Sequence, residues 1–172
     1  MSRLGELTRK VDTFFARVAE RHGTDMQCGT GCSDCCHVRL TITGVEAEAI
    51  RAYAAGLSSQ ARRNLAESGS PERCAALDPA GRCKIYDARP LVCRSHGVPI
   101  RLRRGALPVV RACDRNFQHT TPDPDCVLDQ ATLSAMLFAV DTEARGAGGD
   151  PGASARAERV DLAELLADLA VF

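Results

Sequence analysis

The run Cys28-Gly29-Thr30-Gly31-Cys32-Ser33-Asp34-Cys35-Cys36 holds four of the nine cysteines of the chain and decides how the rest of the sequence is interpreted. Two thiolates spaced by two or three residues can reach one metal centre from a single turn of chain, as in Cys32-x2-Cys35 and Cys28-x3-Cys32. Glycine permits backbone turns that aim several sulfurs inward. The run therefore predicts an irregular metal-binding loop.

Cys35 and Cys36 are neighbours in the chain, which argues for more than one metal centre. Neighbouring side chains diverge in a strand and lie about 100° apart in a helix, so both sulfurs would reach one ion only with an unusual backbone. We therefore expect two neighbouring centres or a polynuclear cluster, with more than four thiolates in total. Later cysteines can supply the remainder. The predicted metal ligands are Cys28, Cys32, Cys35, Cys36, Cys74, Cys83, Cys93 and Cys113.

The ninth cysteine and the histidines are less informative. Cys126 lies among prolines and aspartates, and we interpret it as a small buried hydrophobic residue. His37 and His96 each follow a predicted ligand closely, so each could bind metal or donate a hydrogen bond to a thiolate. We interpret His22 and His119 as ordinary surface histidines. The sequence leaves open whether Cys126, His37 or His96 takes part.

Two groups of basic residues have alternative interpretations. Arg89 and Arg94 lie on either side of Cys93 and would offset the charge of a thiolate cluster, or else form ordinary salt bridges elsewhere in the fold. The stretch Arg101-Leu102-Arg103-Arg104 is interpreted as solvated surface. The chain has 22 basic and 22 acidic residues, so its net charge of zero favours no nucleic-acid partner.

Composition and the N-terminus set the expected compartment. The 172 residues are 45% hydrophobic, enough for one domain with its own core. No run approaches the roughly 18 apolar residues of a membrane span, and the first residues contain no apolar stretch like that of a signal peptide. We therefore expect a cytoplasmic protein with no membrane partner, in which thiols stay reduced. In that setting an odd number of cysteines, two of them adjacent, indicates metal binding rather than disulfides.

The predicted fold is mainly α, a small helical domain with an irregular Cys-rich metal-binding layer and a short β-hairpin around Arg104-Gly105. Apolar residues at spacings of three and four predict a helix over 3–21. The pattern Thr43-x-x-Glu46 is that of a capping box and predicts a helix to about Ala55. The other expected elements are a very short strand at 40–42 and helices at 58–67, just after 87–90, at 127–144 and from 161 onward.

The expected domain organisation has three parts. A Cys-cluster domain with its N-terminal helix covers residues 1–145. The segment 146–156 is rich in glycine and is predicted to be a flexible linker. A C-terminal amphipathic helix at 157–172 is expected to dock on the domain rather than on a partner.

Two blocks resemble the CxxCxxCC family, also called YkgJ-like, which is described as a zinc- or iron-chelating domain. The first is the run at 28–36. The second, Gly81-Arg82-Cys83-Lys84-Ile85-Tyr86-Asp87-Ala88-Arg89-Pro90-Leu91-Val92-Cys93-Arg94, is similar to the family signature C-x-I-Y-x-x-R-P-x-x-C-R. Cys74 fits the family's preceding cysteine. The resemblance covers roughly residues 24–120, with one departure: the first gap has three residues where the family name implies two, which shifts Cys28 relative to Cys32.

The sequence thus predicts a metal-binding protein that chelates zinc or iron, as an ion or as an iron–sulfur cluster. The resemblance extends in part to a flagellin lysine methylase said to carry an iron–sulfur cluster, which keeps iron open as an option. The chain contains no dinucleotide-binding, Walker, zincin or serine-hydrolase motif, so an enzyme is not the first expectation. The alternatives are an iron–sulfur or metal-dependent enzyme with an open coordination site, and a thiol/disulfide redox protein.

Overall fold

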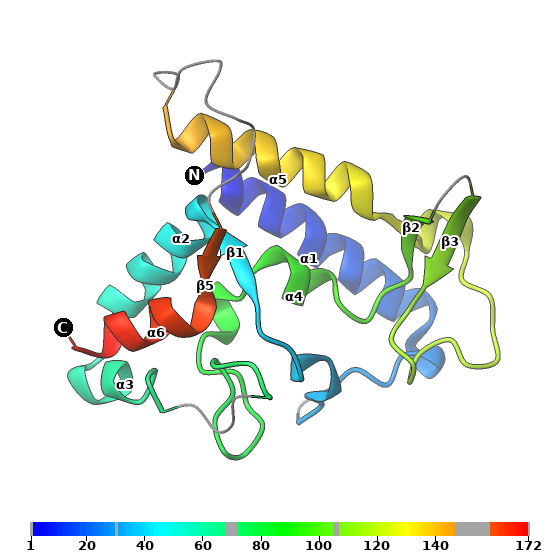
Figure 1. Cartoon of the computed structure of the whole chain (residues 1–172). Coiled ribbons are helices and arrows are strands. Elements are labelled where there is room, and N and C mark those ends of the chain that lie inside the picture. Colours follow the sequence, from blue (N-terminus) through cyan, green and yellow to red (C-terminus); the bar gives the residue numbers. More distant parts are fainter. Residues whose placement is uncertain (1, 30, 68–71, 105–106, 147–158, 172) are drawn as a thin grey trace. The chain divides into compact units, whose positions relative to one another are not determined.

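The computed structural model describes residues 2–29, 31–67, 72–104, 107–146 and 159–171 (Figure 1). The chain divides into two compact units. Unit 1 consists of Met1–Gly29 and Leu91–Val140, and unit 2 of Thr30–Pro90 and Asp141–Phe172. Each unit has its own apolar core. The predicted linker at 146–156 lies outside the described residues apart from its first position.

Unit 1 is built on a long N-terminal helix, a hairpin and short connecting turns. Its elements are α1 (Arg3–Arg21), the 3-10 turn η1 (Gly23–Asp25), α4 (Leu91–Ser95), β2 (Ile100–Arg104), β3 (Leu107–Arg111), the 3-10 turn η4 (Pro124–Cys126), β4 (Leu128–Asp129) and the start of α5 (Gln130–Ala144).

The helix predicted at 3–21 is confirmed, with the same bounds. It begins because the Ser2 hydroxyl accepts a hydrogen bond from Gly5 N at 3.1 Å, which satisfies an amide that has no partner inside the helix. Its apolar stripe is buried, with Val18 fully covered by the core of unit 1. The short helix predicted after Pro90 is also present as α4, and it packs against α1.

The predicted hairpin is confirmed as β2 and β3, which pair antiparallel from Ile100↔Arg111 to Arg104↔Leu107. The structure adds a third strand, because β4 pairs parallel with β2 at Ile100↔Leu128. This pairing moves the start of the helix predicted at 127–144 to Gln130. The carboxylate of Asp129 then caps α5 by accepting a hydrogen bond from Thr132 N at 2.8 Å.

Unit 2 contains the first cysteine run and the C-terminal helix. Its elements are the 3-10 turn η2 (Asp34–Cys36), β1 (Thr41–Thr43), α2 (Gly44–Ala55), α3 (Ser59–Arg63), the 3-10 turn η3 (Tyr86–Ala88), the end of α5, β5 (Arg159–Asp161) and α6 (Leu162–Val171).

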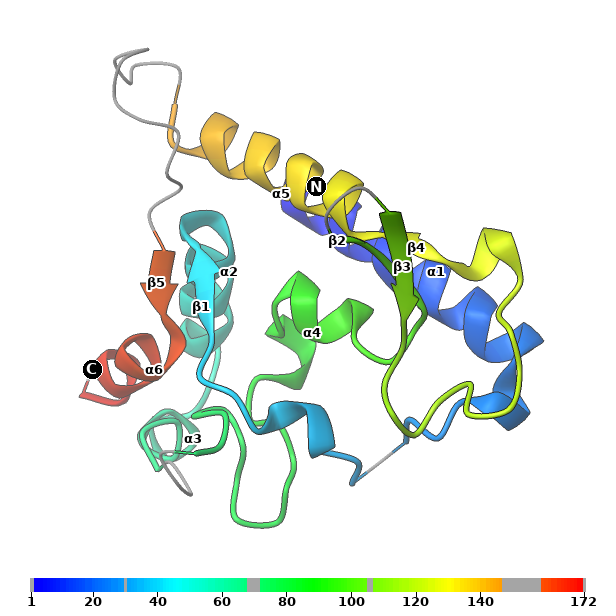
Figure 2. The same ribbon diagram turned by 45° about the vertical axis from the view of Figure 1, so that its right-hand side comes forward.

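The two strands of unit 2 join segments far apart in sequence. The predicted short strand is present as β1, and it pairs antiparallel with β5, with Ile42 opposite Val160 (Figure 2). The next residue after β5, Leu162, donates its amide to Leu40 O at 3.0 Å. The C-terminal helix α6 thereby packs on α2 and α3, and its leucines enter the core of unit 2. The expected docking within the chain is confirmed for α6, which starts at Leu162.

The capping box at the start of α2 is confirmed. Glu46 Oε2 accepts hydrogen bonds from Thr43 N at 3.0 Å and from Thr43 Oγ1 at 2.8 Å. The next helix is shorter than predicted and ends at Arg63. Beyond it the chain continues in tighter turns, as in the hydrogen bond from Leu65 N to Arg62 O at 2.9 Å, and Lys84 Nζ donates to Asn64 O (3.0 Å) and Leu65 O (2.9 Å).

Helices predominate, and two small sheets of two and three strands accompany them. Among the described residues, no helix combines the length and the apolar character that crossing a membrane requires.

The capping box supplies a test of what holds unit 2. Replacing Glu46 by Ala removes both hydrogen bonds from a buried carboxylate, so we expect the free energy of unfolding to fall by about 1–2 kcal/mol. Glu48→Ala on the same helix is the control, because this exposed side chain pairs with Arg51 at the surface and should change stability by less than about 0.5 kcal/mol. Urea unfolding followed by circular dichroism measures both, and equal losses would contradict the assignment.

Candidate metal centres

In unit 2, two cysteine-bearing segments lie side by side. Cys74 N donates a hydrogen bond to Cys36 O at 2.7 Å. This bond joins the end of the first cysteine run to the segment that precedes Cys83. One residue earlier, Arg73 Nη2 donates to Ser33 Oγ at 3.4 Å. Residues separated by about forty positions are therefore held together by their backbone and by polar side chains.

The adjacent pair of cysteines has a geometry that differs from the sequence prediction. Cys35 and Cys36 occupy the 3-10 turn η2, and their sulfurs are 4.0 Å apart. Two thiolates bound at about 2.3 Å to one tetrahedral ion are separated by about 3.8 Å. Strand and helix geometry therefore does not describe this pair, because a short 3-10 turn holds the two sulfurs at nearly that separation. The expectation of two neighbouring centres or a polynuclear cluster stays a prediction.

Cys74 and Cys83 are placed by a tight turn between them. Leu77 and Cys83 form an isolated antiparallel bridge, and Lys84 N donates to Ala76 O at 2.8 Å. The turn is closed by the carboxylate of Asp78, which accepts from Arg82 N at 2.8 Å, and by Gly81, whose φ of +77° suits glycine. Cys74 is buried in the core of unit 2, and Cys83 packs against that core.

Electrostatic coupling connects four thiols of this unit. The hydrogen bond with Cys36 raises the pKa of the Cys35 thiol strongly, and burial and the charge of Cys36 add to the rise. Burial raises the pKa of Cys74, with a smaller contribution from Cys35. Burial also raises the pKa of Cys83, with a smaller contribution from Cys74. Each thiolate would therefore repel the next, so a cation among them favours ionisation of all four.

Cationic side chains offset only part of this repulsion. Lys84 lowers the pKa of both Cys74 and Cys83, and Arg89 lowers that of Cys83, but burial outweighs them. Arg89 also lies over the ring of Tyr86, with 4.1 Å from its guanidinium carbon to the ring centroid. One of the two arginines near Cys93 thus acts on a cysteine, as one of the sequence interpretations proposed.

The four thiols of unit 2 interact electrostatically, but their sulfurs do not form one compact group. Among the described residues of unit 2, no three thiol sulfurs lie mutually within 4.8 Å. A metal ion would draw the turn at Cys35–Cys36 and the turn at Cys74–Cys83 together. Cys32 is half-buried in the same unit, two residues before η2, while His37 is exposed. The thiols of unit 2 are soft sulfur donors, and both zinc and iron accept such ligands.

Unit 1 contains the other cysteines, and Cys28 has the most defined surroundings. The buried side chain of Asn116 donates through Nδ2 to Cys28 Sγ at 3.2 Å and to Gly97 O at 2.7 Å. Its Oδ1 accepts a hydrogen bond from Gln27 N at 2.8 Å, which fixes the orientation of the amide. An N–H donor aimed at sulfur stabilises a thiolate, whether it is free or bound to metal. The sequence analysis missed Asn116, since a lone asparagine carries no local signal.

Cys93 and Cys113 are both half-buried, on α4 and after β3 respectively. Next to Cys93, Arg94 forms a salt bridge with Asp12 of α1, with 2.9 Å between Arg94 Nη1 and Asp12 Oδ2. This is the ordinary salt bridge that the sequence analysis left as the alternative. It anchors the helix that carries Cys93 onto α1.

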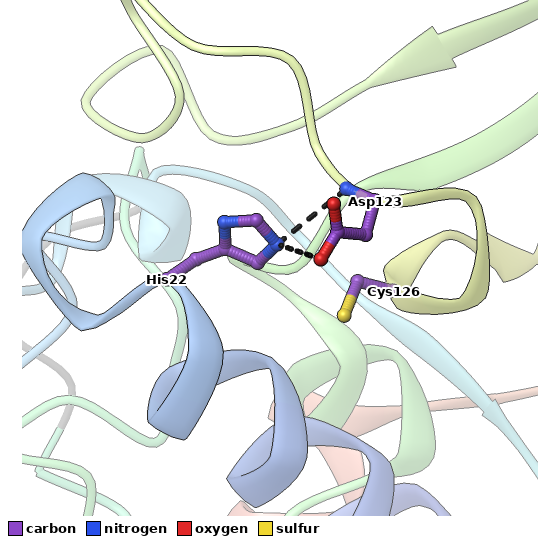
Figure 3. A group of neighbouring side chains, drawn as sticks. All are labelled: His22, Asp123 and Cys126. Carbon is purple, nitrogen blue, oxygen red and sulfur yellow. Dashed lines mark hydrogen bonds and ion pairs between the residues drawn. The ribbon is translucent and has the colours of Figure 1, made fainter.

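A third group of donors was not predicted. The ligand atoms of His22, Asp123 and Cys126 all lie within 4.8 Å of one another (Figure 3). The interpretation of His22 as a surface residue is wrong, because its side chain is only 12% exposed. Cys126 is fully buried, as expected, yet its sulfur lies beside two other donors. His22 and Asp123 are separated by about a hundred residues, so no local spacing could have joined them.

Gly97 supplies a test of how Cys28 is held. A Cβ at this position would lie 2.6 Å from Cys28 Sγ, and the φ of Gly97 is +104°. We expect Gly97→Ala to lower the free energy of unfolding by roughly 1–3 kcal/mol, since both the backbone and the sulfur must shift. Gly23→Ala in the same unit is the control, because an added Cβ there meets nothing within 4 Å. Thermal unfolding compares the two; a Gly97→Ala protein as stable as the control would contradict this packing.

Comparisons with known proteins show the family of the chain. The model of the CxxCxxCC family, described as "Putative zinc- or iron-chelating domain", matches residues 27–126, which is more than half of the chain. No curated protein and no solved structure gives a significant match. The match begins just before Cys28 and ends at Cys126, so it includes all nine cysteines and leaves out His22. The chain therefore belongs to the CxxCxxCC family.

Proposed function

We propose that this protein binds zinc or iron through its cysteines, with one centre formed by Cys35, Cys36, Cys74 and Cys83 of unit 2. The observation that carries the proposal is the pairing of two cysteine segments through the hydrogen bond from Cys74 N to Cys36 O. This hydrogen bond places two turns of chain side by side, so that their four thiols interact electrostatically. Family membership supports metal chelation independently of this geometry.

The charge balance of this group favours a cation. Four thiolates carry four negative charges, and a divalent ion removes two of them. Lys84 and Arg89, which already act on the pKa values of these cysteines, offset part of the remainder. Binding of the ion would release the thiol protons. Four metal–sulfur bonds would then offset the repulsion among the thiolates. Because Cys74 and Cys83 belong to the core of unit 2 or pack on it, the same bonds would stabilise that core.

The proposal retains four further ligands. They are Cys28, Cys32, Cys93 and Cys113. Cys28 is the best supported of these, since the amide of Asn116 donates to its sulfur as donors near metal-bound thiolates do. Eight thiolates suffice for two four-ligand centres, or for one centre and a polynuclear iron–sulfur cluster. A closed set of sulfur ligands would act in binding or storage of metal rather than in catalysis.

Metal analysis of protein purified without air tests the proposal. We expect at least one zinc or iron per chain, and a brown protein with visible charge-transfer absorption if an iron–sulfur cluster is present. Cys35→Ser and Cys83→Ser should each lower the bound metal by one equivalent, because each removes a sulfur donor from a set of four. Val38→Ala is the matched control, because this exposed side chain lies two residues after Cys36 and has no part in joining the two segments, so the variant should keep the full metal content.

Two results would contradict the proposal. The first is wild-type protein that is free of zinc and iron after anaerobic purification and does not take up either ion. The second is equal metal content in the two cysteine variants and in the Val38→Ala control. A loss confined to Cys28, Cys32, Cys93 or Cys113 variants would move the centre to those cysteines and reject the assignment to unit 2.

A further inference from the structure

His22, Asp123 and Cys126 bring three different donors together at one place in unit 1. His22 ends α1, Asp123 directly precedes the turn η4, and Cys126 is the last residue of η4. Figure 3 shows the imidazole facing the Asp123 carboxylate, with Cys126 beside them. An imidazole nitrogen, a carboxylate oxygen and a thiolate sulfur are all ligands that Zn²⁺ takes.

The spacing of these atoms suits one tetrahedral ion. His22 Nε2 and Asp123 Oδ2 are 3.5 Å apart. Two ligands at about 2.1 Å from one tetrahedral zinc are separated by about 3.4 Å, so this pair needs almost no movement. The sulfur of Cys126 lies within 4.8 Å of both, whereas a bound geometry needs about 3.6 Å. An approach of about 1 Å by one side chain on a short turn would complete the set.

The two ring nitrogens of His22 have different neighbours. Nε2 faces Asp123: it accepts a long hydrogen bond from Asp123 N at 3.4 Å and lies 3.5 Å from Asp123 Oδ2. On the other side of the ring, Nδ1 faces Asp25 Oδ2 at 3.6 Å. A carboxylate on the distal nitrogen is the arrangement that orients histidines bound to zinc and makes them better ligands.

The surroundings hold the donors in place. The ring of Phe117 packs edge-on against the imidazole, with 5.2 Å between centroids, and Phe117 N donates to Asp25 O at 2.9 Å. Phe117 adopts a φ of +53°, which costs a bulky residue free energy and is retained where the surroundings enforce it. Cys126 is fully buried in the core of unit 1 with Val18 and Val98.

The local charges are compatible with a bound cation. Arg21 Nη1 lies 4.0 Å from Cys126 Sγ. The same guanidinium is paired with Asp125, so its charge is largely offset. Asp123, Asp25 and a metal-bound Cys126 thiolate would carry three negative charges, of which a divalent ion offsets two.

We propose that His22, Asp123 and Cys126 form a Zn²⁺ site in unit 1 that is separate from the cysteine centre of unit 2. Three protein donors leave one tetrahedral position for water or for an exchangeable ligand, unlike a closed site of four thiolates. Asp25 is a positioning residue that acts through His22. The site depends on a residue that lies before the region matched by the family model.

Zinc titration of the full-length protein under anaerobic conditions tests this site. In wild-type protein the imidazole NMR signals of His22, assigned with His22→Gln, should shift on addition of Zn²⁺. His22→Gln and Asp123→Asn should each bind one Zn²⁺ fewer than wild type. Asp25→Asn should keep the site but weaken it by about 10- to 100-fold, as loss of a carboxylate behind a zinc-bound histidine does.

Matched controls in the same unit are His119→Gln and Asp114→Asn, both at exposed positions, and they should bind zinc as wild type does. Asp123 has a side chain that is 56% exposed, so Asp123→Asn should fold normally and keep the test valid. The proposal is overturned if the three ligand and positioning variants bind zinc like the controls, or if His22 responds only together with His119. A Cys35→Ser protein that retains the His22 response would support two separate sites.

Discussion

The hydrogen bond from Cys74 N to Cys36 O is the contact on which the proposed metal chemistry depends. It fixes two turns of chain next to each other, one carrying adjacent cysteines and one carrying Cys74 and Cys83. Without this hydrogen bond, no other backbone contact described above would hold the two turns together. Burial, with smaller contributions from neighbouring thiols, raises the pKa values of Cys74 and Cys83, and Cys36 raises that of Cys35, so a cation bound among these thiols would favour their ionisation.

The same constraint relates fold and function in unit 2. Cys74 is a core residue, and the strand and helix that close this core come from the C-terminal segment, through the pairing of β1 with β5 and the leucines of α6. Metal binding would therefore stabilise a core that local structure alone holds weakly, since its helices are short. In unit 1 the position of the Cys28 sulfur is fixed by two neighbours. The amide of Asn116 donates a hydrogen bond to it, and Gly97 leaves room for it.

Features encoded by neighbouring residues were predictable from sequence. The helix at 3–21, the capping box at Thr43 and Glu46, and the hairpin around residues 104–105 depend on patterns within a few positions, and all are confirmed. The pairing of β1 with β5 and of β2 with β4 was not predicted, because strands of two or three residues carry too little pattern and their partners lie far away.

The candidate sites divide in the same way. The cysteine run was recognisable because thiols at such short spacing are typical of metal ligands when they stay reduced, as the sequence analysis expected. The separation of the Cys35 and Cys36 sulfurs was not predicted, because strand and helix geometry were considered but a 3-10 turn was not. The group of His22, Asp123 and Cys126 exists only after α1 and η4 meet, so sequence spacing held no sign of it.

X-ray absorption spectroscopy at the metal edge of anaerobically purified protein tests the central claim most directly, because it reports the atoms bound to the metal. If the cysteines of unit 2 hold zinc or iron, the first coordination shell is dominated by sulfur at about 2.3 Å. A shell made of nitrogen and oxygen alone, at about 2.0–2.1 Å, would contradict a cysteine centre.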